Sequence, residues 1–222
     1  IAERGSMFDP GPIVYMYKMA VGPSARGHLD LEAPITDNLR AVAGAKGCDV
    51  DDLTVVILDR PRHEAMIREI RQAGARIRLI TDGDVAGALS TAWPESGIDM
   101  LIGVGGTPEG VLAACALKCM DGEIQGRLHP RDEAEAARAR AQGYDLEKVL
   151  AIDDLVHSND VFFAATGITD GELLDGVKYS GTGARTHSLV MRARTGTVRE
   201  IIATHRWSKL MELSRIQYDP AR

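Results

Sequence analysis

Three short polar stretches of the sequence carry residue types that bind phosphate groups, sugar hydroxyls or metal ions. In the first stretch, Arg60 and Arg62 stand on either side of Pro61, whose fixed φ makes the turn stiff. The planar guanidinium group of arginine forms paired, charge-assisted hydrogen bonds with phosphate. Two surface arginines near a helix start would give the same pattern. This stretch by itself therefore leaves both phosphate binding and simple solvation open.

The second stretch places Asp82 and Asp84 on either side of Gly83. An aspartate at this place is expected first of all to cap the helix that follows, because its side chain accepts a hydrogen bond from a free amide of the first turn. Capping explains only one carboxylate. Two carboxylates that flank a glycine also suit sugar hydroxyls or a divalent cation. Capping and ligand binding both remain open here.

The third stretch, residues 103–110, is the most informative one. Its glycines allow a close backbone approach, Thr107 is a favourable N-cap, and Pro108 suits the first position of a helix. Such a helix start favours an anion, and Glu109 in the first turn complements the helix dipole even without a ligand. The stretch is not a dinucleotide fingerprint, because Pro108 stands where the last glycine of GxGxxG belongs. It also lacks the Gly-Lys-Ser/Thr ending of a Walker loop.

Each stretch follows a predicted strand and leads into a predicted helix. The strands are indicated by apolar and β-branched runs at residues 53–58, 76–80 and 99–104, and the helices by apolar stripes at residues 63–73, 85–91 and 109–119. This alternation predicts an α/β fold with a mostly parallel sheet and flanking helices. Ligands of such sheets bind beyond the carboxyl ends of the strands, so we expect the three stretches to converge on one crevice.

The residue types in this crevice indicate the class of ligand. Arginines fit phosphate, while carboxylates fit hydroxyl groups and a metal ion. The sequence therefore favours a phosphorylated polyol as ligand and a metal-assisted reaction as the chemistry.

Further elements are expected outside the three units. A helix is predicted from Thr36 or Asp37 to Gly44 or Gly47, a solvated helix or excursion at residues 130–143, and a buried strand at residues 161–166. Residues 188–192 and 198–203 are predicted to form an antiparallel pair that turns at Thr195 and Gly196, and a helix followed by a loose tail is expected from Trp207.

Bulk composition excludes several classes of protein. The 222 residues carry a net charge of −6, which does not favour nucleic acid or an anionic membrane surface as a partner, and no apolar run is long enough for a membrane helix. Three cysteines without a CxxC pair fit a reduced, cytosolic environment. Cys115 and Cys119 are expected to pack on one buried helix face rather than to bind a metal ion. The histidines do not suggest a catalytic triad, since no GxSxG elbow is present.

Several longer motifs resemble one known family, the class II fructose-1,6-bisphosphatases of bacteria. These motifs are ILDRPRH, ITDGDVAGA, GVGGTPEGVLAACALKCMDGEIQGRL and FFAATGITDGELLDGV, supported by YMYKMAVGP near the start and by HSLVMRA and REIIATHRWSKL near the end. The resemblance covers nearly all of residues 1–215 and matches the carboxy-terminal part of such enzymes. It implies the layered sugar-phosphatase fold shared with inositol monophosphatases. It also implies a cytoplasmic gluconeogenic enzyme that hydrolyses the 1-phosphate of fructose 1,6-bisphosphate with Mg²⁺ or Mn²⁺, as a dimer or tetramer.

The resemblance also assigns roles to individual residues. It implies that the substrate contacts Tyr15, Arg60, Pro61, Arg62, Asp82, Gly83, Asp84 and Gly106, and that Glu109 is a metal ligand. By its own pattern, Tyr15 is an aromatic residue in an apolar stretch, which is more often core than ligand. Many family members have lysine where this chain has Arg60, which keeps the charge and changes the phosphate contact.

The resemblance further implies that residues 1–35 end an amino-terminal subdomain and that residues 36–222 form a sugar-phosphate-binding domain. The water-positioning residues and the remaining metal ligands are expected upstream of Ile1, so the chain alone is expected to be weak or inactive. Three alternatives stay open: a non-catalytic sugar-phosphate-binding domain, a bisphosphatase that also accepts sedoheptulose 1,7-bisphosphate, and, more distantly, a dinucleotide-binding oxidoreductase.

Overall fold

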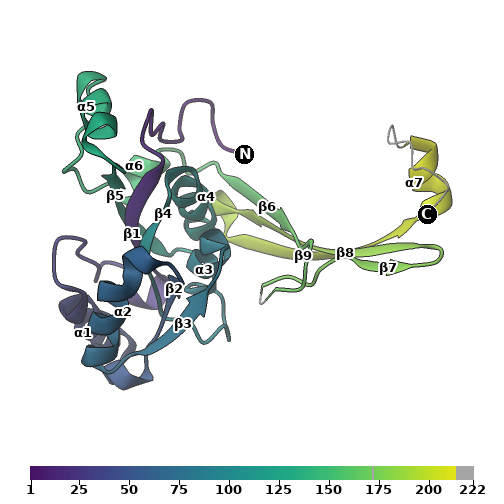
Figure 1. Ribbon diagram of the computed structural model, residues 1–222. Helices are drawn as coiled ribbons and strands as arrows, with labels where there is room; N and C mark the ends of the chain where they lie inside the picture. The colour runs from purple at the N-terminus through teal and green to yellow at the C-terminus, as the bar shows by residue number, and fades with distance from the viewer. Residues whose placement is uncertain (172, 214–222) are drawn as a thin grey trace.

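Three parallel strands form one side of a five-stranded sheet. The computed structural model describes residues 1–171 and 173–213 of the chain. The parallel strands are β2 (Thr54–Leu58), β3 (Arg76–Ile80) and β4 (Met100–Gly106), with β2 in the middle. The helices that follow them in the chain are α2 (Glu64–Ala73), α3 (Asp84–Ser90) and α4 (Thr107–Lys118). The α/β architecture predicted from the alternating pattern is confirmed (Figure 1).

Two antiparallel strands complete the sheet and make it mixed. They are β1 (Tyr15–Val21) and β5 (Glu123–His129), and the strand order is β3-β2-β4-β1-β5. Tyr15 pairs with Gly106 of β4 on one side and with His129 of β5 on the other. No strand was predicted at either place, and β1 lies inside the described sheet, between β4 and β5.

Helices cover both faces of this sheet. One face packs on α1 (Ile35–Lys46) and α2 through Leu39, Val42, Ile67 and Ile70, and the other packs on α3 and α4 through Leu89, Ala114 and Leu117. Successive residues of a strand point to opposite faces, so Met16 and Ala20 of β1 join the second core while Met19 and Val21 join the first.

The helix ends follow partly from local sequence. α1 begins at Ile35 after Pro34, slightly before the expected Thr36 or Asp37, and ends at Gly47 in the left-handed conformation. The segment expected to be solvated contains α5 (Glu133–Ala141), whose Glu135, Ala136 and Ala139 are buried. One side of α5 therefore packs on the protein.

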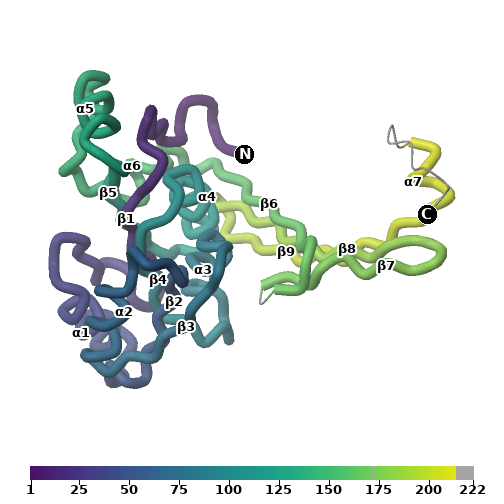
Figure 2. The backbone as a smooth tube through the Cα atoms, in the orientation of Figure 1, coloured from purple at the N-terminus to yellow at the C-terminus, as the bar shows by residue number. Residues whose placement is uncertain are grey.

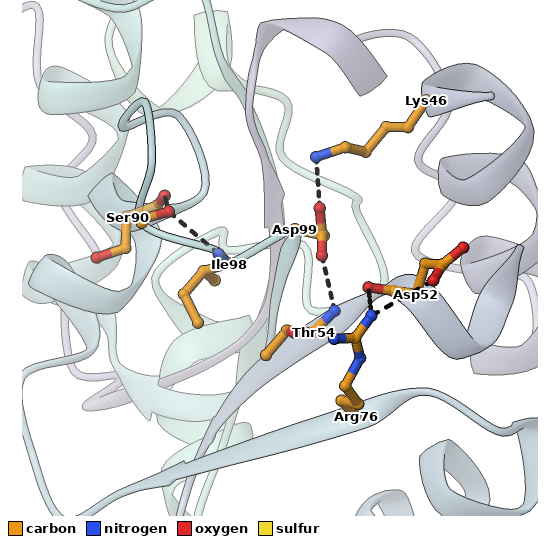
Figure 3. A network of polar contacts seen from close by, with 8 residues as sticks. Lys46, Asp52, Thr54, Arg76, Ser90, Ile98 and Asp99 are labelled. Atoms are coloured by element: carbon orange, nitrogen blue, oxygen red, sulfur yellow. Dashed lines mark hydrogen bonds and ion pairs between the residues drawn. The ribbon is translucent and has the colours of Figure 1, made fainter. Parts of the chain in front are cut away.

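The amino ends of the three parallel strands are tied together by polar contacts (Figure 3). Asp99, just before β4, accepts a hydrogen bond from the Thr54 amide at 2.7 Å and pairs with Lys46 at the end of α1. Arg76 of β3 donates to the carbonyl oxygens of Asp51 and Asp52 in the short turn η2 (Val50–Asp52). The charged groups at this edge are thus paired with one another or with backbone groups, and they serve to hold the strands together.

A second, antiparallel sheet extends from the helix-covered body as an arm (Figures 1 and 2). Its central strand β8 pairs with β9 along its whole length and with β6 and β7 on its other edge; α6 precedes this sheet and α7 follows it. The bounds are α6 (Ile152–Leu155), β6 (Phe162–Thr166), β7 (Lys178–Ser180), β8 (Gly183–Arg192), β9 (Thr197–Arg206) and α7 (Trp207–Leu213).

The arm tests three predictions. The antiparallel pair is confirmed, and it turns through η4 (Ala193–Thr195) and Gly196. The strand predicted at residues 161–166 exists, but its burial was wrongly predicted, because Phe162–Thr166 alternates between exposed and half-buried residues. The helix after Trp207 is confirmed, and the expected tail lies outside the described residues. None of the described helices is both long and apolar enough to cross a membrane.

Candidate functional site

The three polar stretches lie side by side at the carboxyl edge of the parallel strands. β2 pairs with both β3 and β4, so the turns that follow these strands must be neighbours. The antiparallel strand β1 brings its first residue, Tyr15, to the same edge, opposite Gly106. The structure therefore brings together Tyr15, the arginine turn, the aspartates and the glycine-rich turn.

Arg62 is held above Tyr15. Its Nε and Nη2 atoms donate to the carbonyl oxygen of Val104 at 3.0 and 2.8 Å, and its guanidinium carbon lies 5.3 Å from the centre of the Tyr15 ring. A guanidinium group has five N–H donors, so donors remain after these contacts. Arg62 is exposed. It can therefore present a fixed, positively charged edge to an anion.

Arg60 connects two of the turns. Its Nη1 and Nη2 atoms donate to the carbonyl oxygens of Asp59 and Thr81 at 2.9 and 2.5 Å, which joins the end of β2 to the end of β3. Pro61 begins the short turn η3 (Pro61–His63) that leads into α2. In this arrangement Arg60 stabilises the turn, and Arg62 is the better placed of the two arginines to meet a ligand.

His63 fixes the backbone beneath these arginines. It is fully buried; its Nδ1 lies 2.7 Å from the Leu58 carbonyl oxygen, and its Nε2 accepts a hydrogen bond from the Val104 amide at 2.8 Å. These partners require the proton on Nδ1. Burial, opposed by the Leu58 hydrogen bond, lowers the pKa of His63. The sequence indicated no catalytic role for His63, and only the fold reveals that it links β2 to β4.

The two aspartates have different roles, and neither caps α3 with its side chain within the described structure. The N-cap is Gly83, whose φ of +80° is in the left-handed region that favours glycine. Side-chain capping, one of the two roles that the sequence left open, is therefore not observed here. Asp82 is exposed, whereas Asp84 is buried and its Oδ2 lies 2.5 Å from the Nζ atom of Lys18.

Lys18 is the residue at this edge that sequence reasoning missed. It lies on β1, is only 2% exposed, and donates to the Gly106 carbonyl oxygen at 3.1 Å as well as pairing with Asp84. Its signal in the sequence is a single charged residue within an otherwise uncharged strand. That signal could not identify a partner, because Asp84 is far away in the chain and is brought near only by the sheet.

The glycine-rich turn forms the start of α4. Gly106 is the N-cap and Thr107 the first helical residue, so the prediction of Thr107 as N-cap is wrong. The Thr107 hydroxyl is buried and has no partner among the described residues. The Glu109 carboxylate folds back over Gly106, so that a Cβ on Gly106 would lie 1.7 Å from Glu109 Oε2. Gly106 thus provides the space that an exposed carboxylate occupies.

The surroundings of Tyr15 are electrostatically positive. His129, its partner across β5, has its pKa lowered by burial and by the neighbouring guanidinium groups of Arg62 and Arg127. Positive neighbours that disfavour a charged histidine favour a bound anion. Next to this edge, a pocket of about 510 Å³ is lined in part by Asp82, Gly83 and Thr169.

An acidic group elsewhere in the chain does not belong to this site. Asp49, Asp51 and Asp52 lie close enough to share an ion and are exposed. They precede β2, whereas the arginine turn follows it, so the length of the strand separates them from the site. Asp52 is already paired with Arg76.

Comparison with known proteins gives a consistent family. Residues 1–205 match the family described as "Bacterial fructose-1,6-bisphosphatase, glpX-encoded". The chain is 42% identical over 218 residues to the "Fructose-1,6-bisphosphatase 1 class 2" of Escherichia coli, an alignment that covers 92% of this chain and 65% of the relative. The "Fructose-1,6-bisphosphatase class 2" of Shigella flexneri matches with the same identity and coverage. The chain thus spans about two thirds, 65%, of the length of these relatives.

Proposed function

The chain belongs to the bacterial glpX-encoded fructose-1,6-bisphosphatase family, and from this premise we propose that it supplies the substrate-binding half of a sugar-bisphosphatase site. The reaction is the hydrolysis of the 1-phosphate of fructose 1,6-bisphosphate to fructose 6-phosphate and phosphate. The observation that carries the proposal is the convergence, at one sheet edge, of the Arg62 and Tyr15 pair with the carboxylates of Asp82 and Glu109.

The positive and negative parts of this edge suit different parts of the substrate. Arg62, held by the Val104 carbonyl and stacked on Tyr15, binds the phosphate that is not cleaved, and Arg127 adds to the local positive potential. Asp82, which lines the adjoining pocket, accepts hydrogen bonds from sugar hydroxyls. Asp84, Gly83 and Gly106 shape the backbone around the substrate, and holding the sugar in one orientation lowers the entropic part of the barrier.

Glu109 fits one position in a divalent metal site. Its carboxylate is exposed at the start of α4, and carboxylate oxygens are the ligands that Mg²⁺ and Mn²⁺ prefer. Such an ion, when bound, activates water and neutralises phosphoryl oxygens. One carboxylate is too few for a complete site. We propose that the other ligands come from the part of the family's length that this chain does not cover.

The direct test is phosphate release from fructose 1,6-bisphosphate by the native protein in which this chain occurs. We expect release that depends on Mg²⁺ or Mn²⁺ and stops when a chelator is added. Sedoheptulose 1,7-bisphosphate, tested in parallel, defines the substrate range. Release that does not exceed a protein-free control would refute the proposal.

The second candidate function is sugar-phosphate binding without catalysis. It is favoured by the proposed metal site, for which Glu109 is the one ligand assigned among the described residues. Calorimetric titration of the 222-residue chain with fructose 1,6-bisphosphate and fructose 6-phosphate separates the two functions. Binding by the chain and no turnover by the native protein would support the second function.

The assembly and cellular location of the native protein also remain proposals. We propose a cytoplasmic homo-oligomer, a dimer or tetramer, on the basis of the family resemblance. Light scattering of the purified native protein measures its mass. A monomer at micromolar concentration would contradict the proposed homo-oligomer.

A further inference from the structure

We propose that Lys18 is a positioning residue of the candidate site: its ammonium group fixes the Asp84 carboxylate and the start of α4 in the arrangement that the sugar bisphosphate recognises. The inference rests on the proposed function for its ligand. Its structural part stands on the contacts of Lys18 alone.

Both charges of the pair lie away from water. The side chains of Lys18 and Asp84 are 2% and 9% exposed, and their charged atoms are 2.5 Å apart. Lys18 follows Met16 and precedes Ala20 on the face of β1 that packs on α3 and α4. A buried ion pair is often no more stabilising than apolar residues of the same volume. Stability alone therefore does not explain a lysine at this position. The contacts that Lys18 makes with Asp84 and Gly106 do explain it.

Lys18 also holds the peptide that begins α4. The carbonyl oxygen of Gly106 accepts from Lys18 Nζ at 3.1 Å, and the amide of Thr107, on the same peptide unit, donates to the Val14 carbonyl oxygen at 2.8 Å. Carbonyl and amide of one peptide point in opposite directions. Contacts at both ends therefore fix its rotation; Lys18 of β1 supplies one contact, and Val14, the residue just before β1, supplies the other.

The pair and the glycine-rich turn are in tight contact. A Cβ on Gly105 would lie 2.2 Å from Asp84 Oδ2 and 3.1 Å from Lys18 Nζ. The cavity lined by Lys18, Asp84, Gly103 and Gly105 measures only about 10 Å³. Such a space holds at most one water molecule. Lys18 thus cannot reach a sugar phosphate, and it acts through Asp84 and the turn.

The first test uses Lys18→Met, which keeps a long side chain and removes the charge. In the native protein we expect KM for fructose 1,6-bisphosphate to rise roughly tenfold or more and kcat to change less, because substrate binding is what the pair organises. Asp84→Asn and the double variant Lys18→Met/Asp84→Asn complete a cycle. If Lys18 acts through Asp84, the double variant loses no more than the worse single variant.

The double variant also deals with misfolding, because it removes both buried charges instead of leaving one unpaired. The matched control is Lys118→Met. Lys118 is a nearly buried lysine, 7% exposed, that pairs with Asp153 at 2.8 Å at the far end of α4. This control should leave KM unchanged.

Hydrogen exchange measures the positioning without any substrate. In Lys18→Met we expect the amides of Gly105, Gly106, Thr107 and Glu109 to exchange at least tenfold faster than in the parent protein. In Lys118→Met we expect these amides to exchange at the parent rate. Two results would overturn the inference. One is that these amides exchange in Lys18→Met at the parent rate; the other is that the effects of the two single substitutions on KM multiply in the double variant. If the parent protein neither binds nor hydrolyses the bisphosphate, the proposed function fails, and the exchange rates still decide whether Lys18 positions the turn.

Discussion

Replacing Gly106 by alanine should separate the chemistry of the site from the stability of the fold. Gly106 has φ −59° and ψ 139°, a conformation that alanine adopts freely. The added Cβ would lie 1.7 Å from Glu109 Oε2, which is an atom at the end of an exposed, flexible side chain. The side chain of Glu109 must therefore move, and the backbone can stay.

The magnitudes of the two effects differ widely. Alanine is a poorer N-cap than glycine, which costs roughly 0.5–1 kcal/mol of the free energy of unfolding. The carboxylate oxygen must shift by about 1.5 Å or more to reach van der Waals distance from the new methyl group. Metal–ligand distances are defined to about 0.2 Å, and a misplacement of about 1 Å costs on the order of 10²-fold in rate. We therefore expect a loss of about 10²-fold in metal-dependent kcat/KM.

The assay measures phosphate release by the native protein over a range of Mn²⁺ concentrations, together with urea unfolding of each variant. Glu109→Gln should show a similar loss of activity, and the double variant Gly106→Ala/Glu109→Gln should lose little more. Gly44→Ala, in the exposed part of α1 with no atom near the new Cβ, serves as the control and should keep full activity.

Two results would refute this reasoning. If Gly106→Ala keeps parental activity at limiting Mn²⁺, the position of the Glu109 carboxylate does not matter. If Gly106→Ala lowers the free energy of unfolding by more than about 3 kcal/mol, the carboxylate is not free to move.

Three further outcomes follow from the same geometry. Gly105→Ala places a Cβ 2.2 Å from the buried Asp84 carboxylate, and disrupting its ion pair should cost about 3–5 kcal/mol in urea unfolding. Arg62→Lys loses the paired bonds to a carbonyl and the stacking on Tyr15, so KM should rise about tenfold in steady-state kinetics with the fold intact, as checked by circular dichroism. The folded protein holds the pKa of His63 below the ordinary 6.5, so the unfolded chain binds more protons at acidic pH. The free energy of unfolding, measured between pH 8 and 5, should therefore decrease as the pH drops through about 6.5. The decrease should be smaller in His63→Gln.

The site residues were predictable where the chemistry is local. Arg60, Arg62, Asp82 and Glu109 follow strands whose β-branched runs are evident in the sequence, and strand ends of a parallel sheet must lie together. Tyr15 was assigned only by family resemblance. Its place at the edge depends on β1 pairing with β4, a contact between residues about ninety positions apart.

Two of the predictions that failed concern helix starts. Thr107 and the aspartates have good capping side chains, and in the structure glycines occupy both N-cap positions. Propensity is a weak preference, and tertiary contacts overrode it. Asp84 turns inward because Lys18 offers a charge there, and Glu109 folds over Gly106 because that residue has no side chain.

The sequence by itself determined the α/β class, the three repeated units and the chemical types gathered at their ends, because periodicity and turn residues act over a few positions. Only the tertiary structure decided which of those groups face a ligand and which support the others. The placement of β1 brings Lys18 beneath the glycine-rich turn. The pairing of β2 with β4 lets His63 form hydrogen bonds with both strands. Both arrangements depend on contacts between distant residues, and no local pattern encodes their geometry.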